Sequence, residues 1–261
     1  MRVKLNDIFI NYEILGSGKT LVLIHGLGAN AQTWKNQVPV LSRHYQVLTW
    51  DVRGHGQSDK PAGDYSVKLF ASDLTALISA LGIGSIFVLG HSMGGVIALR
   101  FALDFPDLCN AIIISSSSAE VNPQATTRWQ NIAATILERG IEAIPSDPTR
   151  LFSKGFVERN PEIVAEFMTR RLVNDPSCYA RSALAVSKYN YNEELSGIGC
   201  PTLIMVGDQD VTAPPGGSVR MSRLIQGSKL IIFKDCGHIS YVEQPEIFNR
   251  VVLDFLAKVS N

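Results

Sequence analysis

The chain has 261 residues, of which 46% are hydrophobic, enough for one large domain with a substantial core or for a domain with an insertion. Basic and acidic residues number 24 each, so neither nucleic acid nor a membrane surface is expected as a partner. No apolar run reaches membrane-spanning length and the first residues do not resemble a signal peptide, which predicts a soluble cytoplasmic protein.

Strands and helices are predicted to alternate over the first 115 residues. Residues 3–5 and 8–14 alternate apolar and polar side chains around Asn6-Asp7, a pattern typical of a β-hairpin. Short apolar runs then alternate with amphipathic stretches, which predicts an α/β fold, a mostly parallel, twisted sheet with helices on both faces. The strands are expected at 21–24, 45–50, 86–89 and 111–114, and the helices at 34–41, 67–81 and 96–105.

This alternation stops after the four serines at 115–118. From about residue 121 to residue 192 only helical periodicity is found, and prolines separate the helical segments. A stretch of helices alone, between two sets of strands, is interpreted as an insertion. The prolines stand at positions 123, 145, 148, 161 and 176.

Strands are predicted again at 202–206 and 229–233, followed by a helix at 245–258. The insertion is expected to lie over the carboxyl edge of the sheet, where open α/β sheets bind ligands. The expected domains are an α/β core of residues 1–119 and 193–261 and an inserted helical cap of residues 120–192.

A serine between two glycines follows the strand expected at 86–89. In the run Gly90-His91-Ser92-Met93-Gly94, a sharp turn would hold Ser92 in a strained conformation that lifts its hydroxyl out of the sheet, and side chains at 90 and 94 would collide with backbone. The short pattern alone occurs by chance, but the preceding apolar run and the following helix provide the context that it requires. Ser92 is the candidate nucleophile.

A serine hydroxyl needs a base to remove its proton and a carboxylate to orient that base. His238 directly follows the strand at 229–233, so its loop is expected to open at the same sheet edge as Ser92. Two carboxylates, Asp208 and Asp210, follow the preceding strand. Asp210 lies further along the loop and is expected to turn back toward His238, whereas Asp208 is expected to tether its own turn. Both stay candidates for the acid.

The tetrahedral intermediate of acyl transfer carries an oxyanion that needs two backbone donors. One is expected to be the amide of Met93, which follows the nucleophile. The other is expected from Leu27, in the glycine-rich loop His25-Gly26-Leu27-Gly28. Together with these two residues, an apolar pocket is expected to be lined by Trp129, Val211 and Ile239.

Taken in chain order, these motifs resemble those of the α/β-hydrolase-fold enzymes that carry a helical cap. The order Ser, Asp, His is the order of that family, and the family pattern ends on the acid, which supports Asp210. Among these enzymes the chain is most similar to 3-oxoadipate enol-lactonases and small carboxylesterases. The segments that carry the resemblance are 25–28, 51–58, 90–95, 207–210, 210–215 and 237–245.

The resemblance leaves the particular substrate open. Where the lactonases tend to carry arginine and aspartate, this chain has Ser187, Lys188 and Asn190. A substrate derived from a dicarboxylate would require a cationic residue in the cap. The arginines available there, each more typical of a solvated helix face than of a substrate contact, are Arg128, Arg139, Arg170, Arg171 and Arg181.

The resulting hypothesis is a serine hydrolase that cleaves a small-molecule carboxylic ester or lactone through an acyl-enzyme, with Ser92, His238 and Asp210 as the triad. Two alternatives stay open: a carbon–carbon bond hydrolase acting on a vinylogous diketone, and a slow-turnover ligand receptor that uses the same pocket. No metal or organic cofactor is expected, because no metal-ligand spacing or dinucleotide fingerprint occurs. The four scattered cysteines predict reduced thiols, and the oligomeric state stays open.

Overall fold

The computed structural model describes residues 1–260 and contains one eight-stranded sheet with the strand order β1-β2-β4-β3-β5-β6-β7-β8. β2 pairs antiparallel with β1 and with β4, and the other neighbours in the sheet are parallel. The mostly parallel sheet predicted from the sequence is therefore confirmed. The strands are β1 (Arg2–Leu5), β2 (Ile8–Leu15), β3 (Thr20–Ile24), β4 (Gln46–Trp50), β5 (Ile86–His91), β6 (Cys109–Ser115), β7 (Thr202–Gly207) and β8 (Lys229–Phe233).

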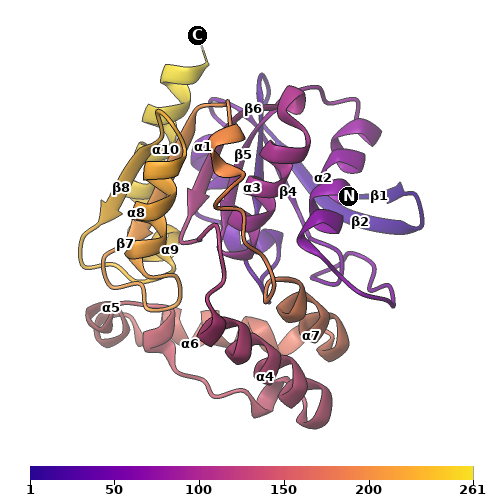
Figure 1. Ribbon diagram of the computed structural model, residues 1–261, viewed down its shortest axis with the longest axis vertical. Coiled ribbons are helices and arrows are strands. Elements are labelled where there is room, and N and C mark those ends of the chain that lie inside the picture. The colour runs from indigo at the N-terminus through magenta and orange to yellow at the C-terminus, as the bar shows by residue number, and fades with distance from the viewer. Residues whose placement is uncertain (261) are drawn as a thin grey trace.

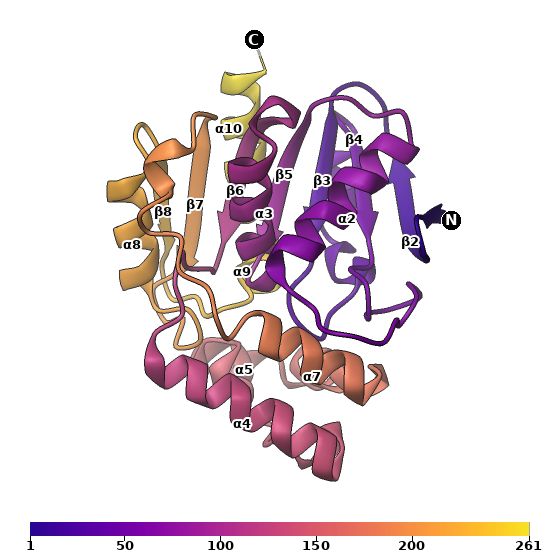
Figure 2. The ribbon, with the colours of Figure 1, turned by 45° about the vertical axis from the view of Figure 1, so that its right-hand side comes forward.

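Helices cover both faces of this sheet (Figures 1 and 2). The alternation of side chains along a strand explains why both faces are apolar. In β3, Val22 and Ile24 belong to the apolar cluster on one face, whereas Leu21 and Leu23 belong to the cluster on the other. The first face is covered by α2 (Val67–Ala80), α3 (Met93–Asp104) and α8 (Pro215–Leu224), and the second by α1 (Val38–Leu41) and α10 (Pro245–Val259).

The helix predicted at 34–41 is wrong as a continuous element. The chain instead forms a single 3-10 turn, Ala31–Trp34, and the short α1. Pro39 stands in the first turn of α1, where its missing N–H is tolerated, but its ring would clash with the carbonyl four residues earlier if the helix continued through it.

Between β6 and β7 the chain forms the α4–α7 segment, which lies at the carboxyl ends of the parallel strands (Figure 2). Three of its helices begin at a proline, in the first turn, where proline is tolerated. Asn122 and Asp175 cap two of these starts through side-chain oxygens. The helices are α4 (Pro123–Arg139), α5 (Lys154–Arg159), α6 (Pro161–Thr169) and α7 (Pro176–Ala185).

The backbone that leads into the α4–α7 segment is hydrogen-bonded to the backbone that leads out of it. The amide of Val121 donates to the carbonyl of Tyr189 at 3.1 Å, and that of Tyr191 donates to Ala119 at 2.8 Å. The segment is thus closed at its base, next to the ends of β6 and β7. A short helix α9 (Ser240–Glu243) precedes α10. Among residues 1–260, no helix is long and apolar enough to cross a membrane.

Candidate active site

The turn between β5 and α3 holds Ser92 with a φ of 53°, in the left-handed region that side chains rarely adopt. Only glycine fits two positions before Ser92 and two positions after it. A Cβ at Gly90 would run into the carbonyl of Gly94, and a Cβ at Gly94 would run into the carbonyl of Ile24. Both collisions agree with the expectation from the sequence, and the turn leaves Ser92 half-buried rather than enclosed.

His238 and Asp210 meet in the loops after β8 and β7. Nδ1 of His238 lies 2.8 Å from Oδ2 of Asp210, and the two side chains are 3% and 0% exposed. The other oxygen of Asp210 accepts hydrogen bonds from the amides of Thr212 at 2.9 Å and Ala213 at 2.8 Å. The carboxylate is therefore fixed in orientation, and it holds the imidazole so that Nε2 is the free ring nitrogen.

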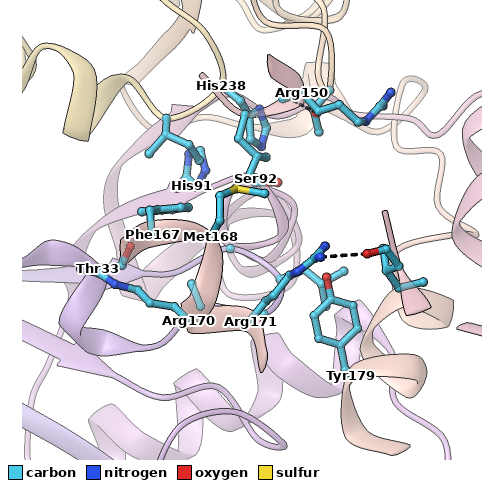
Figure 3. A pocket seen from close by; sticks show the side chains of 18 of the residues that line it. Thr33, His91, Ser92, Arg150, Phe167, Met168, Arg170, Arg171, Tyr179 and His238 are labelled. Carbon is cyan, nitrogen blue, oxygen red and sulfur yellow. Dashed lines mark hydrogen bonds between the residues drawn. The ribbon is translucent and has the colours of Figure 1, made fainter. Parts of the chain in front are cut away.

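Ser92 and His238 line the same cavity, and Figure 3 shows them together, with Arg171 across the cavity. Within the described chain no hydrogen bond joins the Ser92 hydroxyl to the imidazole of His238. Bonds of this kind are commonly long in the absence of substrate and shorten when it binds.

Asp208, the other candidate for the acid, does not contact His238. Its carboxylate accepts a hydrogen bond from the amide of Cys236 at 3.1 Å, and the amide of Gln209 donates to the carbonyl of Cys236 at 2.9 Å. The expectation that Asp208 tethers its own turn is therefore wrong. Asp208 instead joins the loop after β7 to the loop after β8 that carries His238, and so it helps to hold the two loops together.

The loop after β3 lies directly against Ser92. A Cβ on Gly26 would come within 3.4 Å of the Cβ of Ser92. The next residue, Leu27, lines the space around Ser92, and its amide donates to no acceptor within residues 1–260. Met93 is the first residue of α3, where amides have no partner within the helix. Both amides predicted to hold the oxyanion thus belong to backbone next to Ser92.

Two cavities meet at Ser92. The first, here called the His238 cavity, has a volume of about 190 Å³, and the second, the Met93 cavity, about 350 Å³. Ser92, Leu27 and Trp129 border both of them, and Ile239 borders the His238 cavity. Among the described residues, no three His, Cys, Asp or Glu side chains gather as ligands of a metal ion would.

Val211 does not line either cavity, which corrects the prediction made from the sequence. Its side chain is 54% exposed. The physical reason is the turn at Asp210, whose carboxylate binds the amides of Thr212 and Ala213 and leaves Val211 at the outer corner. Thr212 faces inward instead and borders both cavities.

Arginines form much of the wall of the His238 cavity. Of the expected set, Arg128, Arg170 and Arg171 border it, and Arg150 does so as well. Arg139 borders a separate outer hollow. Arg181, the last of the expected arginines, lies outside the His238 cavity, where it donates to the carbonyl of Pro61 and stacks on Tyr65.

The pocket arginines differ in how their charges are compensated. Arg170 pairs with Glu166 at 2.7 Å, and Arg171 donates to backbone carbonyls. Within residues 1–260 Arg128 and Arg150 form no ion pair. Burial, and after it the charge of Arg150, lowers the pKa of Arg128, so two guanidinium groups repel each other at this wall. Such a wall attracts a negatively charged ligand group.

One link between the α4–α7 segment and the histidine loop escaped the sequence analysis. The carboxylate of Glu243 accepts hydrogen bonds from the amide and hydroxyl of Ser153 at 3.1 and 2.5 Å, and from the amide of Gly237 at 2.9 Å. The amide of Ile239 also donates to the carbonyl of Leu151. Nothing in the spacing of these residues indicates their contact, because 90 residues separate Ser153 from Glu243.

Three further histidines, His25, His55 and His91, are buried, and each has a lowered pKa. The ring of His91 lies 4.8 Å from that of His238 and 4.9 Å from that of Tyr241. Burial, with the neighbouring His238, lowers the pKa of His91 well below its ordinary value. Burial also lowers the pKa of His25 and brings the pKa of His55 to about 3.

These low pKa values predict a loss of stability in acid. Between about pH 3 and the unfolded-state pKa of about 6.5, the unfolded chain binds a proton at His55 that the folded chain does not, so stability falls as the pH falls through this range. At about pH 4.5, we expect His55 to cost about 2–3 kcal/mol relative to pH 7.

Thermal unfolding measured from about pH 7 to pH 4 tests this expectation. His55→Gln should reduce the slope of stability against pH, because one of the three buried neutral histidines is gone. His44 is exposed, so His44→Gln is the matched control and should leave the slope as in the parent chain. Equal slopes in the parent and His55→Gln would contradict the assignment of the low pKa.

Comparison with known proteins agrees with this architecture. The family model described as alpha/beta hydrolase fold matches residues 19–245. The chain is 30% identical over 250 residues to 3-oxoadipate enol-lactonase 2 of Acinetobacter baylyi, which covers 94% of this chain and 92% of that protein. It is 29% identical over 258 residues to a putative carbamate hydrolase of Stutzerimonas stutzeri, covering 95% and 97%.

Two solved structures are similar over their whole length. A thermophilic esterase from Thermogutta terrifontis superposes with a TM-score of 0.93 at 28% identity and covers 100% of both chains. The enol-lactonase from Burkholderia xenovorans LB400 superposes with a TM-score of 0.91 at 27% identity, covering 98% of this chain and 100% of that one.

Proposed function

The chain belongs to the α/β hydrolase fold family, and we propose that it is a serine hydrolase that cleaves a small carboxylic ester or lactone. One observation carries the proposal. A strained serine, Ser92, shares a cavity with His238, whose other ring nitrogen is held at 2.8 Å by the buried carboxylate of Asp210. Names of relatives add support, because enol-lactonases and an esterase are among them.

The proposed reaction has two stages. In the first, Ser92 attacks the ester carbonyl while Nε2 of His238 takes its proton, and Asp210 stabilises the imidazolium that forms. The amides of Leu27 and Met93 hold the oxyanion of the tetrahedral intermediate. His238 then gives its proton to the departing alkoxide, which leaves an acyl group on Ser92.

In the second stage the same groups act on water. His238 removes a proton from a water molecule, the resulting hydroxide attacks the acyl carbonyl, and collapse of the second intermediate releases the carboxylic acid and returns the proton to Ser92. For a lactone, the alcohol and the acid belong to one molecule, so the product is a single hydroxy or keto acid.

Residues 120–192 are proposed to act as a cap that shapes the substrate site. The paired backbone at residues 119–121 and 189–191 supports these boundaries, since it closes the base of the segment. From α4, Trp129 borders both of the cavities that Ser92 borders. From α7, Tyr179 packs on Gly28 of the loop that carries Leu27.

Kinetics on a short-chain ester test the proposed function. An enzyme should turn over p-nitrophenyl acetate many times per chain, at a rate proportional to its concentration. A slow-turnover receptor would release about one equivalent of product and then stop. That single slow turnover, or binding without product, would contradict the proposal.

The unpaired guanidinium of Arg128 predicts a preference for anionic esters. Arg128→Gln should lower the ratio of kcat/KM for monomethyl succinate to kcat/KM for methyl butyrate by about tenfold, because a hydrogen bond to a charged group contributes about 1.5 kcal/mol. Arg139→Gln is the matched control, because Arg139 lies on the same helix but borders only the outer hollow. An unchanged ratio in Arg128→Gln would show that this charge does not face the substrate.

A further inference from the structure

Two of the four cysteines lie side by side at the amino ends of neighbouring strands. Sγ of Cys109, the first residue of β6, is 3.8 Å from Sγ of Cys200, which stands two residues before the start of β7. Both are free thiols. Cys109 is buried and Cys200 is half-buried, so one thiol of the pair is open to a small oxidant and the other is sheltered beside it.

A β-bulge in β6 brings the two cysteines level with each other. Against β5, the register moves from Cys109 to Ala111 in a single step, so β6 carries one extra residue, Asn110. Against β7, the residue three positions after Cys109 pairs with the residue two positions after Cys200. The extra residue accounts for this difference and sets Cys109 opposite Cys200. An unbroken strand would place Asn110 there and turn Cys109 to the other face of the sheet.

This placement suits a disulfide between the two strands. Adjacent strands lie about 4.8 Å apart, and a disulfide joins residues whose Cα atoms are about 4.4–6.8 Å apart. To bond, the two sulfurs must approach by roughly 1.8 Å, from 3.8 Å to about 2.0 Å. A movement of this size is within the reach of side-chain rotation, so the backbones of β6 and β7 can stay paired.

The contact between the two thiols gives them different reactivities. A hydrogen bond from Cys109 lowers the pKa of the Cys200 thiol. The same contact, and after it burial, raises the pKa of the Cys109 thiol. The thiolate is the nucleophilic form of cysteine, so the half-buried Cys200 is the thiol that reacts first with an oxidant.

We propose that Cys109 and Cys200 are an oxidation-sensitive pair that a peroxide converts into a disulfide. With hydrogen peroxide, the sulfur of Cys200 attacks one oxygen, the O–O bond breaks, and a sulfenic acid and one water form. The sulfur of Cys109 then attacks the sulfenic sulfur, which forms the S–S bond, breaks the S–O bond and releases a second water. Two thiols are thereby oxidised, and one peroxide is reduced to two waters.

The disulfide closes the chain around the whole α4–α7 segment. Cys109 and Cys200 are 91 residues apart, and residues 120–192 lie between them. The amino ends of β6 and β7 lie at the edge of the sheet away from this segment (Figure 2). A cross-link that closes a long loop restricts the unfolded chain strongly, so oxidation is expected to stabilise the fold.

Peroxide treatment of the full chain, first reduced and then freed of reductant, tests the proposal. The free thiols, counted in denaturant, should fall from four to two. Peptide analysis without reductant should find the Cys109 peptide joined to the Cys200 peptide. The unfolding midpoint should rise by about 5 °C or more, and dithiothreitol should reverse the rise. None of these readouts uses ester hydrolysis, so the test does not depend on the proposed function.

Three variants separate this pair from the other thiols. Cys200→Ser should abolish the rise in the unfolding midpoint, and Cys109→Ala makes the same test from β6 should Cys200→Ser not fold. Cys178→Ser is the matched control and should keep the rise, because within residues 1–260 no hydrogen bond joins Cys178 to another cysteine.

Four outcomes would overturn the proposal. The first is four free thiols after peroxide treatment, and the second is a disulfide between any other two cysteines. The third is oxygen added to Cys200 while Cys109 stays a free thiol, which would mean that the pair does not close. The fourth is an equal rise of the unfolding midpoint in Cys200→Ser.

Discussion

Replacing Ser92 by alanine is expected to lower the turnover of a short-chain ester by roughly 10⁴- to 10⁶-fold. In the proposed reaction the Ser92 hydroxyl is the protein group that bonds to the acyl carbon, and the amides of Leu27 and Met93 cannot replace it. The remaining rate comes from binding and from stabilisation of the oxyanion. Alanine fits the turn as well as serine does, because both carry a Cβ at the same strained φ of 53°.

Steady-state kinetics and thermal unfolding on the same preparation test this prediction. The unfolding midpoint of Ser92→Ala should stay close to that of the parent chain, so that the loss of activity is chemical. Ser72→Ala, an exposed serine on α2, is the control for loss of a hydroxyl. Ester hydrolysis retained in pure Ser92→Ala would contradict the assignment of the nucleophile.

Asp210→Asn is expected to cost about 10⁴-fold in kcat, with the fold preserved. An asparagine accepts through one oxygen only, and it favours the tautomer of His238 that protonates Nε2, which then cannot accept the proton of Ser92. Thr212 and Ala213 donate to Oδ1 of Asp210, so the side-chain oxygen of asparagine has these amides as partners and its NH₂ faces His238.

Asp208→Asn is the matched comparison, since it removes a carboxylate two positions earlier in the same loop. Asp208 accepts from the amide of Cys236 and does not contact His238, and the oxygen of an asparagine keeps that acceptor, so Asp208→Asn should change both kcat and stability little. Kinetics and unfolding of both variants decide the matter. A larger loss of kcat in Asp208→Asn than in Asp210→Asn would mean that Asp208 is the acid.

Much of this fold follows from local patterns in the sequence. β3, β5 and β7 are continuous apolar runs because parallel strands with helices on both faces have no polar side. The elbow at Ser92 is equally local: glycine is needed at 90 and 94 because neighbouring backbone fills the space of any Cβ there. Features of this kind are encoded within a few residues of where they act.

One helix was missed because its sequence is compatible with both a turn and a helix start. No helix is predicted between β7 and β8, yet α8 begins at Pro215 and continues through Gly216 and Gly217. A proline followed by two glycines is typical of a turn, but here the proline stands in the first turn of a helix, where it is tolerated. Met221 then anchors α8 in the core, a contact that spacing alone does not reveal.

Some features of the candidate site can likewise be predicted from the sequence, and others cannot. That His238 and Asp210 follow adjacent strands is visible in the sequence, because parallel strands end at one edge of the sheet. The sequence does not reveal that Val211 points outward or that Glu243 binds Ser153. Both features depend on how each loop folds against segments far away in the chain. Loop side chains therefore required the structure, whereas strand ends did not.

Covalent labelling of Ser92 is the measurement that bears most directly on the proposed catalytic role of this residue. The full chain is treated with a p-nitrophenyl alkylphosphonate, and intact-mass and peptide analysis then locate the phosphonyl group. We predict one group per chain, on the peptide that contains Ser92, together with complete loss of ester hydrolysis and no label in Ser92→Ala. A label on any other residue of the parent chain, or an equal label on Ser92→Ala, would contradict the account.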